Sequence, residues 1–445
     1  MNILPINGRV AIIDDKIEQA HPLMQELSKR KIPFVYYDAK PENLPSKGNI
    51  NDLRLIFLDL NLIDDAVHKV KEIYPLIYAN IDALVAENNV AYILACWSRT
   101  DNEFIEIVSK LKEDLPKKKP IAEIMIPKLD YFEFNGARKA DYSDQIDSLF
   151  KKITDLYAEH TTFSNLVEWE NHIHNATSYT LSEALSVSDY EWDDNNADWI
   201  LTKLGQAYAG KHFSDKNDKE KKIASYHALN KLLEESISEK IQKTENSLFI
   251  TSKDEKSGFK EKLNEKLMFS ATPSHFCEPG SFIFEKNDNL FKNILAFVAT
   301  KIVPELESKL LKNELEERKI KDCFFKTKRK LIRETWDTFF LVVNPICDFA
   351  QKKTQLNRIV PGILINAQHM NLINSSSEAI YISPIFHYSR KEDNYFFILD
   401  FRFFSALSIK GDEADCKYRL KQEVLSEIIS KLARHINRQG ILFID

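Results

Sequence analysis

The stretch LRLIFLDLNL, residues 53–62, decides the fold of the first third of the chain. Six residues, of which only Arg54 is polar, lead to Asp59, and such an apolar run is typical of a strand buried on both faces. Similar runs stand before and after it, namely RVAIIDD (9–15), IPFVYYD (32–38), VAYILACWS (90–98) and IAEIMIPK (121–128).

Amphipathic helical patterns separate these runs. They include LMQELSKR (23–30), a long stretch at 64–88 that contains Pro75, and DNEFIEIVSKLKEDL (101–115). Strands that alternate with helices predict an α/β fold with a doubly wound, five-stranded parallel sheet. Pro75 lacks an amide hydrogen and is expected to kink or break its helix.

Polar side chains stand where four of the predicted strands end. Asp14 and Asp15 end the first strand, Asp59 the third, Ser98 the fourth and Lys128 the fifth. The carboxyl ends of parallel strands meet at one edge of an open sheet, so these groups are expected to gather there. Two or three carboxylates suffice to bind Mg²⁺, which keeps several waters. The alternative is that each aspartate only caps the next helix.

The segments IIDD, LIFLDLNL, ILACWS and IPK together resemble the receiver domain of two-component signalling, over about residues 8–135. The resemblance implies that Asp59 is the phosphoacceptor and that Asp14 and Asp15 help to bind Mg²⁺. It also implies that the backbone carbonyl of Asn61 supplies a further metal ligand.

The same resemblance assigns roles to two other strand-end residues. Ser98 would stand where the family has a Ser or Thr that responds to the phosphoryl group, and Lys128 would pair with its charge. The chain departs from the family in having Leu129 after the lysine, where Pro is usual, and a longer interval between the third and fourth strands. If Ser98 or Lys128 is misaligned, the domain would be a pseudo-receiver.

From Ser143 onward the sequence is predicted to be helical. Apolar residues recur at a spacing of three or four at Ile146, Leu149, Ile153, Leu156, Phe163 and Val167, and His160 fills one polar position. Residues 143–170 are therefore expected to form a helix that transmits the signal. It could be the coiled-coil seam of a homodimer or an ordinary amphipathic helix packed on its own domain.

The last third groups its strands instead of alternating them with helices. The β-rich runs are SFIFE (281–285), DTFFLVVNPICDFAQKK (337–353), VPGILINA (360–367), AIYISPIFHYS (379–389) and NYFFILDFRFFSALSI (394–409). They predict a small barrel-like or sandwich domain with helices, and the final helix (419–438) has Gly440 as its stop signal. NPICDFAQKK and LNEKLMFS (263–270) resemble β-barrel modules of bacterial sensor and conflict-system proteins.

The 445 residues are expected to form three parts, a receiver-like domain at 1–138, a helical linker or domain at 139–262 and a β-rich domain at 263–445. The formal net charge of −6 does not favour nucleic acid as a partner. MNILPINGRV lacks the features of a signal peptide, and no 18-residue apolar segment predicts a membrane span. The five cysteines form no CxxC pair, so a reduced, cytoplasmic protein is expected.

The other cysteine and histidine residues that could carry chemistry are expected to have structural roles. Cys347 stands beside Asp348, which should raise the pKa of the thiol, so Cys347 is expected to be a buried structural residue and not a nucleophile. The spacing of His172, His174, His275 and Cys277 matches no known zinc-binding pattern, so these residues are not expected to bind a metal. Lys353 is expected to shape a turn or a ligand surface together with Asp348.

These observations predict a response-regulator-like protein and not a classical enzyme, because the nucleotide-binding patterns GxGxxG and GxxxxGK[ST] are absent. Its expected partner is a histidine kinase or another phosphodonor protein, and its output would pass to the C-terminal module. A second hypothesis is a phosphorylation-independent scaffold of an antiphage defence system. A third is a nucleic-acid-binding effector that uses the basic stretch at 319–333.

Overall fold

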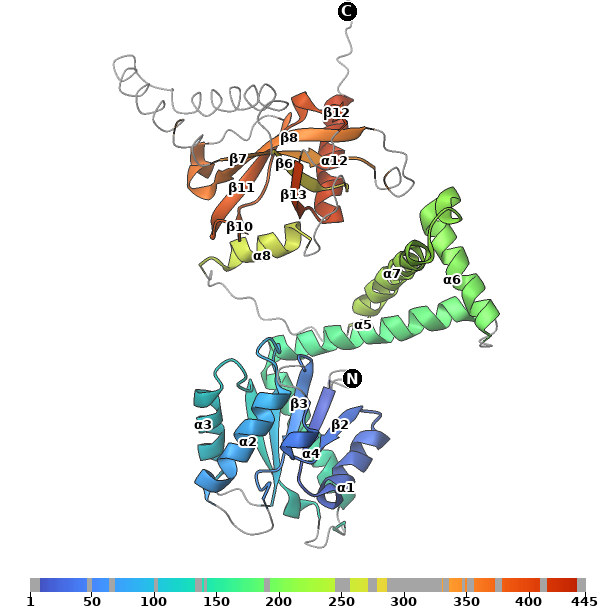
Figure 1. Ribbon diagram of the computed structural model, residues 1–445. Coiled ribbons are helices and arrows are strands. Elements are labelled where there is room, and N and C mark those ends of the chain that lie inside the picture. Colours follow the sequence, from blue (N-terminus) through green and yellow to red (C-terminus); the bar gives the residue numbers. More distant parts are fainter. Residues whose placement is uncertain are drawn as a thin grey trace, which may run out of the picture. The chain divides into compact units, whose positions relative to one another are not determined.

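The computed structural model describes residues 9–45, 50–63, 69–99, 103–132, 138–139, 142–187, 193–244, 257–270, 278–285, 330, 336–345, 349, 356–372, 378–408 and 414–437. The chain divides into two units (Figure 1). The first comprises Met1–Tyr208 with Lys216–Thr251, and the second comprises Ala209–Asp215 with Ser252–Asp445.

A five-stranded sheet in the order β2-β1-β3-β4-β5 is the centre of the first unit, and every described pairing within it is parallel. Its strands are β1 (Arg9–Ile13), β2 (Phe34–Tyr37), β3 (Leu53–Leu58), β4 (Ile93–Ser98) and β5 (Ala122–Pro127). All residues of β3 and β4 are buried, as expected for strands covered on both faces. The predicted parallel α/β sheet is confirmed.

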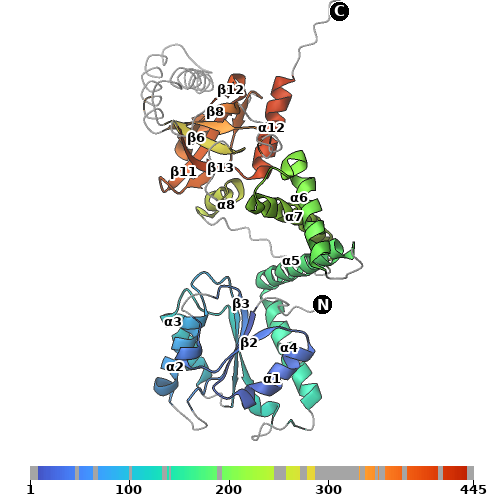
Figure 2. The ribbon, with the colours of Figure 1, turned by 45° about the vertical axis from the view of Figure 1, so that its right-hand side comes forward.

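Helices cover both faces of this sheet (Figure 2). They are α1 (Ile17–Lys29), α2 (Val70–Leu84), α3 (Phe104–Asp114) and α4 (Tyr142–Glu159). On one face, Val10 and Ile12 of β1 pack in a core with α1 and α4. On the other, Ala11 and Ile13 share a core with α2 and α3. The alternation of side chains along β1 thus supplies both layers.

Helix α2 runs without interruption through Pro75, so the predicted break does not occur. The proline removes the hydrogen bond that the carbonyl of Lys71 would accept. Lys71 is exposed and lies near the start of the helix, where water can replace the missing donor.

The predicted helix at 143–170 is interrupted at His160, which separates α4 from α5 (Thr161–Ser186). The apolar residues on its predicted seam lie in the core of the first unit, among them Ile146, Ile153 and Val167. The coiled-coil interpretation is therefore wrong for these residues, and the ordinary amphipathic helix is confirmed. Because α4 completes the core of the parallel sheet, this core extends past residue 138.

Two further helices complete the described part of the first unit. These are α6 (Asp194–Ala209, whose last residue is grouped with the second unit) and α7 (Asp218–Gln242). Helix α7 packs along α5. It begins with a capping box in which the Asn217 side chain accepts the amide hydrogen of Glu220.

In the described ranges of the second unit, the strands form one antiparallel sheet in the order β10-β11-β8-β7-β6-β13, to which β9 and β12 are added. The strands are β6 (Ser281–Glu285), β7 (Asp337–Val342), β8 (Asn357–Asn366), β9 (Ile380–Ile382), β10 (Phe386–Tyr388), β11 (Asp393–Asp400), β12 (Ser405–Leu407) and β13 (Ala414–Arg419). The predicted β-rich domain is confirmed, but β13 was not predicted.

The antiparallel sheet curls so that its two edge strands approach each other. The ring centroids of Tyr388 on β10 and Tyr418 on β13 are 5.3 Å apart. Phe269, which follows α8 (Phe259–Met268), contacts Tyr418 and also Phe386. Helix α12 (Gln422–Ile436) buries Leu425, Ile428 and Leu432 in the same core. The aromatic cluster thus joins the two edges of a half-barrel.

Several sequence predictions fall on residues outside the described ranges. They are Cys347, Asp348, Lys353, His275, Cys277, Gly440 and, apart from Lys330, the basic stretch at 319–333. Within the described ranges, His172 Nε2 lies 3.1 Å from the Thr244 hydroxyl and 3.9 Å from a Glu168 carboxylate oxygen. No helix in the part of the chain that the structure describes has the length and hydropathy needed to cross a membrane.

Candidate functional site

The parallel sheet places Asp14 and Asp59 at the same edge. The amide of Asp59 donates to the carbonyl of Ile13 (2.8 Å), and the amide of Asp14 donates to the carbonyl of Tyr37 (3.1 Å). These bonds continue the ladders of β1 by one residue beyond the strands. The two aspartates are therefore aligned by the backbone, and Asp15 follows directly.

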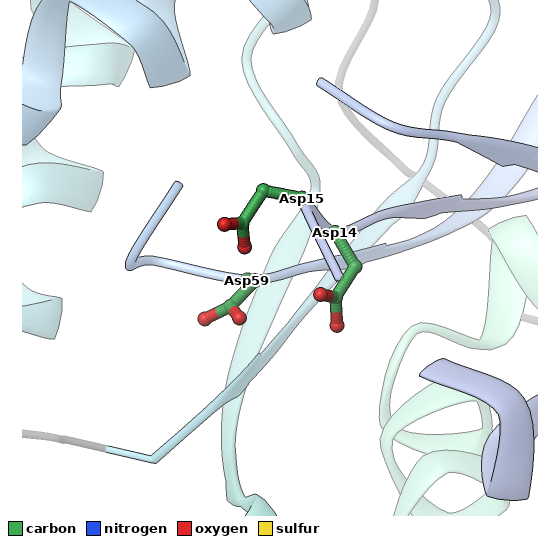
Figure 3. Close-up of side chains that lie close together, drawn as sticks. All are labelled: Asp14, Asp15 and Asp59. Carbon is green, nitrogen blue, oxygen red and sulfur yellow. The ribbon is translucent and has the colours of Figure 1, made fainter. Parts of the chain in front are cut away.

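The three predicted carboxylates do converge (Figure 3). One oxygen from each of Asp14, Asp15 and Asp59 lies within 4.8 Å of the others. Asp14 and Asp59 are buried, whereas Asp15 is partly exposed. The cluster is thus open to water on the side of Asp15.

Lys128 connects two of the three carboxylates. Its Nζ donates to Asp14 Oδ2 (2.7 Å) and to Asp59 Oδ2 (2.5 Å). The lysine side chain is only 4% exposed. It begins the 3₁₀ turn Lys128–Asp130 directly after β5, so the lysine predicted from the IPK segment does reach the acidic cluster.

The second oxygen of each buried carboxylate accepts a backbone amide two residues further along the chain. Asp14 Oδ1 accepts the amide of Lys16, and Asp59 Oδ1 accepts the amide of Asn61, both at 3.0 Å. Neither aspartate caps a helix, because α1 has Lys16 and α2 has Lys69 as the N-cap residue. The helix-capping alternative is therefore wrong for Asp14 and Asp59.

Burial and crowding of like charges make the cluster reluctant to ionise. Desolvation, opposed by Lys128 and reinforced by Asp59, raises the pKa of Asp14 from 3.8 to about 6. Burial and the charge of Asp59 also raise the pKa of Asp15. When all groups are ionised, the three carboxylates together with the Lys128 ammonium that bridges two of them carry a net charge of −2.

Ser98 ends β4, which lies between the strands that lead to Asp59 and Lys128. Its hydroxyl is completely buried and has no hydrogen-bond partner among the described residues. A buried hydroxyl without a partner is unusual in a folded protein.

Two residues of the site have no signal in the sequence. Gln19, in the first turn of α1, accepts a bond from Lys128 Nζ (3.2 Å). Tyr36 of β2 donates its hydroxyl to the carbonyl of Asp14 (2.6 Å), and burial next to Asp14 raises the pKa of this phenol. Both are ordinary residue types for their elements. Only the packing of α1 and β2 beside the cluster reveals them.

A small cleft adjoins the cluster on the side of α1. Lys128 belongs to its lining, together with Glu18, Gln19, Pro22, Arg99, Leu129 and Phe132. The lysine that bridges the acids therefore also lines a concave surface.

The donor set fits a divalent cation of the Mg²⁺ type. Mg²⁺ prefers hard oxygen ligands and retains waters, which suits carboxylates with one open side. The excess of two negative charges would be neutralised by such an ion. Asp14, Asp15 and Asp59 are the side chains that would hold it.

The fold and the site together define a class, an α/β unit with a parallel five-stranded sheet and an acidic cluster at its carboxyl edge. This combination is compatible with a receiver-like fold. No protein-family model matches the chain, and no curated protein matches it.

Among solved structures, the crystal structure of adenylate cyclase from Rhodopirellula baltica matches 35% of this chain and 97% of that chain, with 11% identity and a TM-score of 0.19. A TM-score this low does not support a shared fold.

Proposed function

We propose that the first unit is a receiver domain in which Asp59 accepts a phosphoryl group from a histidine kinase or a related phosphodonor. The observation that carries this proposal is the convergence of Asp14, Asp15 and Asp59 around Lys128 at one edge of a parallel sheet. A merely structural ion pair would need one acid for one lysine. Three crowded acids, two of them with raised pKa values, are instead typical of a functional site.

The proposed reaction is transfer of a phosphoryl group from a phosphohistidine nitrogen to a carboxylate oxygen of Asp59. The new bond is O–P and the broken bond is N–P, whose electron pair remains on the imidazole, which then takes up a proton. A bound Mg²⁺ would supply charge neutralisation at the transferring oxygens. Lys128, already bonded to Asp59, would pair with the added negative charge, and the Ser98 hydroxyl would donate to a phosphoryl oxygen.

The contacts of β4 and β5 support a route by which this site could influence the following helix. Trp97 directly precedes Ser98, and Phe132 lies four residues after Lys128. The ring centroids of Trp97 and Phe132 are 5.8 Å apart. Phe132 in turn lies 5.3 Å from Tyr142, the first residue of α4. A shift of Ser98 or Lys128 would therefore reach α4 through packed aromatic rings, from which a C-terminal output module could be controlled.

The test is the mass of the intact protein after incubation with acetyl phosphate, with and without Mg²⁺. We expect one added phosphoryl group in the presence of Mg²⁺ and none in Asp59→Asn. Asp38→Asn is the matched control, because Asp38 also follows a strand of the same sheet but binds Asn43 and Lys40 outside the cluster. Equal labelling of wild type and Asp59→Asn would refute the proposal.

One observation favours the phosphorylation-independent scaffold as a second candidate. Lys128 bridges Asp14 and Asp59, so the buried part of the cluster is already held together by protein groups alone. The scaffold predicts no phosphoryl adduct under any condition and no change in stability on adding Mg²⁺. The same mass measurement, together with a titration of beryllofluoride binding, separates the two candidates.

A further inference from the structure

The helices that follow the parallel sheet expose an apolar groove. It has a volume of about 390 Å³ and lies where α5, α6 and α7 meet. Its lining is almost wholly apolar and consists of Ala184, Val187, Trp199, Ile200, Leu204 and Leu232, with Glu183 and Lys203.

Three large apolar side chains of the groove face solvent. Val187 is 70% exposed, Trp199 55% and Leu232 40%. Exposed apolar surface that is contiguous and has a hollow at its centre is characteristic of an interaction site in a soluble protein. A small polar molecule would find few groups here to orient it, so the groove suits apolar side chains of a protein partner.

The charges of the groove favour a second copy of this chain as the partner. It contains one acid, Glu183 on α5, and one base, Lys203 on α6. In a dimer with two-fold symmetry the same patch meets itself, and residue i of one copy contacts residue j of the other while j contacts i. A patch with one charge of each sign is complementary to its own two-fold copy, since each Glu183 can meet a Lys203.

We propose that the chain forms a homodimer through this groove, with Trp199 of each copy covering the apolar lining of the other and with reciprocal pairs between Glu183 and Lys203. Residues on the buried face of α4 take no part, because they belong to the core of the parallel sheet. The proposal does not depend on phosphorylation of Asp59.

Sedimentation velocity of the full chain over a range of concentrations tests the proposal. A monomer has a mass of 51.7 kDa, and we expect a concentration-dependent species of twice that mass. Trp199→Glu should abolish it. Trp169→Glu is the matched control, because Trp169 is a similarly exposed tryptophan (50%) on α5 outside the groove, and it should leave the dimer intact.

Charge reversal makes the test specific for a two-fold interface. Glu183→Lys and Lys203→Glu should each raise the dimer Kd about tenfold, since each loses two reciprocal pairs. An equimolar mixture of the two single variants should dimerise again. In the mixed dimer both positions are basic in one chain and acidic in the other, so both reciprocal pairs are restored with their signs rearranged.

A monomer at all concentrations would overturn the proposal, and protection of Val187 and Trp199 from labelling would then indicate that a segment of the same chain covers the groove. A dimer whose Kd is unchanged by Trp199→Glu would overturn the proposal as well, because its interface would lie elsewhere. Failure of the mixed variants to associate would exclude the reciprocal pairing. Proper folding of each variant is checked by its unfolding temperature, since the substituted residues are exposed.

Discussion

Folding changes the protonation of Asp14 in the acidic pH range. Its carboxyl group is completely buried, beside two other acids, and its pKa rises from 3.8 to about 6. Between these two pH values the folded protein holds a proton that the unfolded chain releases. Ionisation of Asp14 therefore lowers the stability of the metal-free protein as the pH rises through this window.

Mg²⁺ affinity should depend on this proton. A cation needs ionised Asp14, so we expect the affinity to rise by about tenfold per pH unit below pH 6 and to level off above it. Isothermal titration between pH 5 and pH 8 measures the dependence. Asp14→Asn should bind Mg²⁺ more weakly and with a flatter pH profile, whereas equal affinities of the wild type at pH 5 and pH 7 would contradict the proposed site.

At the scale of elements, the attachment of α5 to the sheet depends on a partly buried ion pair. The Arg54 guanidinium on β3 binds Glu170 of α5 through two hydrogen bonds, of 2.8 and 2.5 Å. The arginine side chain is only 5% exposed. The carbonyl of Arg54 also accepts the hydroxyl of Tyr157 from α4 (2.8 Å). One residue at the start of β3 thus contacts both helices.

Loss of this pair should destabilise the first unit. Glu170→Gln leaves a buried guanidinium without its counter-charge, and we expect a loss of about 2 kcal/mol in the free energy of unfolding. Asp147→Asn is the control, because Asp147 pairs with Arg30 at an exposed position and should matter much less. Urea unfolding of both variants measures the two losses of stability. Equal losses would contradict the view that burial makes the Arg54–Glu170 pair important.

At the scale of the whole molecule, each unit has its own hydrophobic core, so each should unfold separately. Gly362 on β8 offers a substitution confined to the second unit. A Cβ atom at this position would lie 2.5 Å from Phe339 Cζ, 2.8 Å from Leu399 Cδ2 and 2.9 Å from the carbonyl of Ile398. Neither the Ile398 backbone nor the packed Phe339 ring can yield easily.

Gly362→Ala should therefore destabilise the second unit by about 1–3 kcal/mol. Calorimetry should show one transition lowered and the other unchanged, and the Mg²⁺ affinity of the first unit is the internal control. A common shift of both transitions, or a change in Mg²⁺ affinity, would show that the two units are energetically coupled.

The local pattern of the sequence determined those strands and strand ends that depend only on residues nearby in the chain. Apolar runs that end in polar residues predicted all five parallel strands, and the strand ends predicted that Asp14, Asp15, Asp59 and Lys128 would meet. This succeeds because parallel strands share one carboxyl edge, so that position along the chain converts directly into position in space. The β-rich character of the last third followed from its grouped aromatic and β-branched runs in the same way.

Only the tertiary structure decided the features that depend on which distant surfaces meet. The seam on α4 could have faced a second chain or its own sheet, and the periodicity is the same in both cases. Pro75 is tolerated because its helix begins only five residues earlier. Gln19 and Tyr36 join the site, and Trp199 remains exposed, because of how whole elements pack. Hydrophobic periodicity specifies that a face will be buried, but the choice of the surface that buries it is made by the fold as a whole.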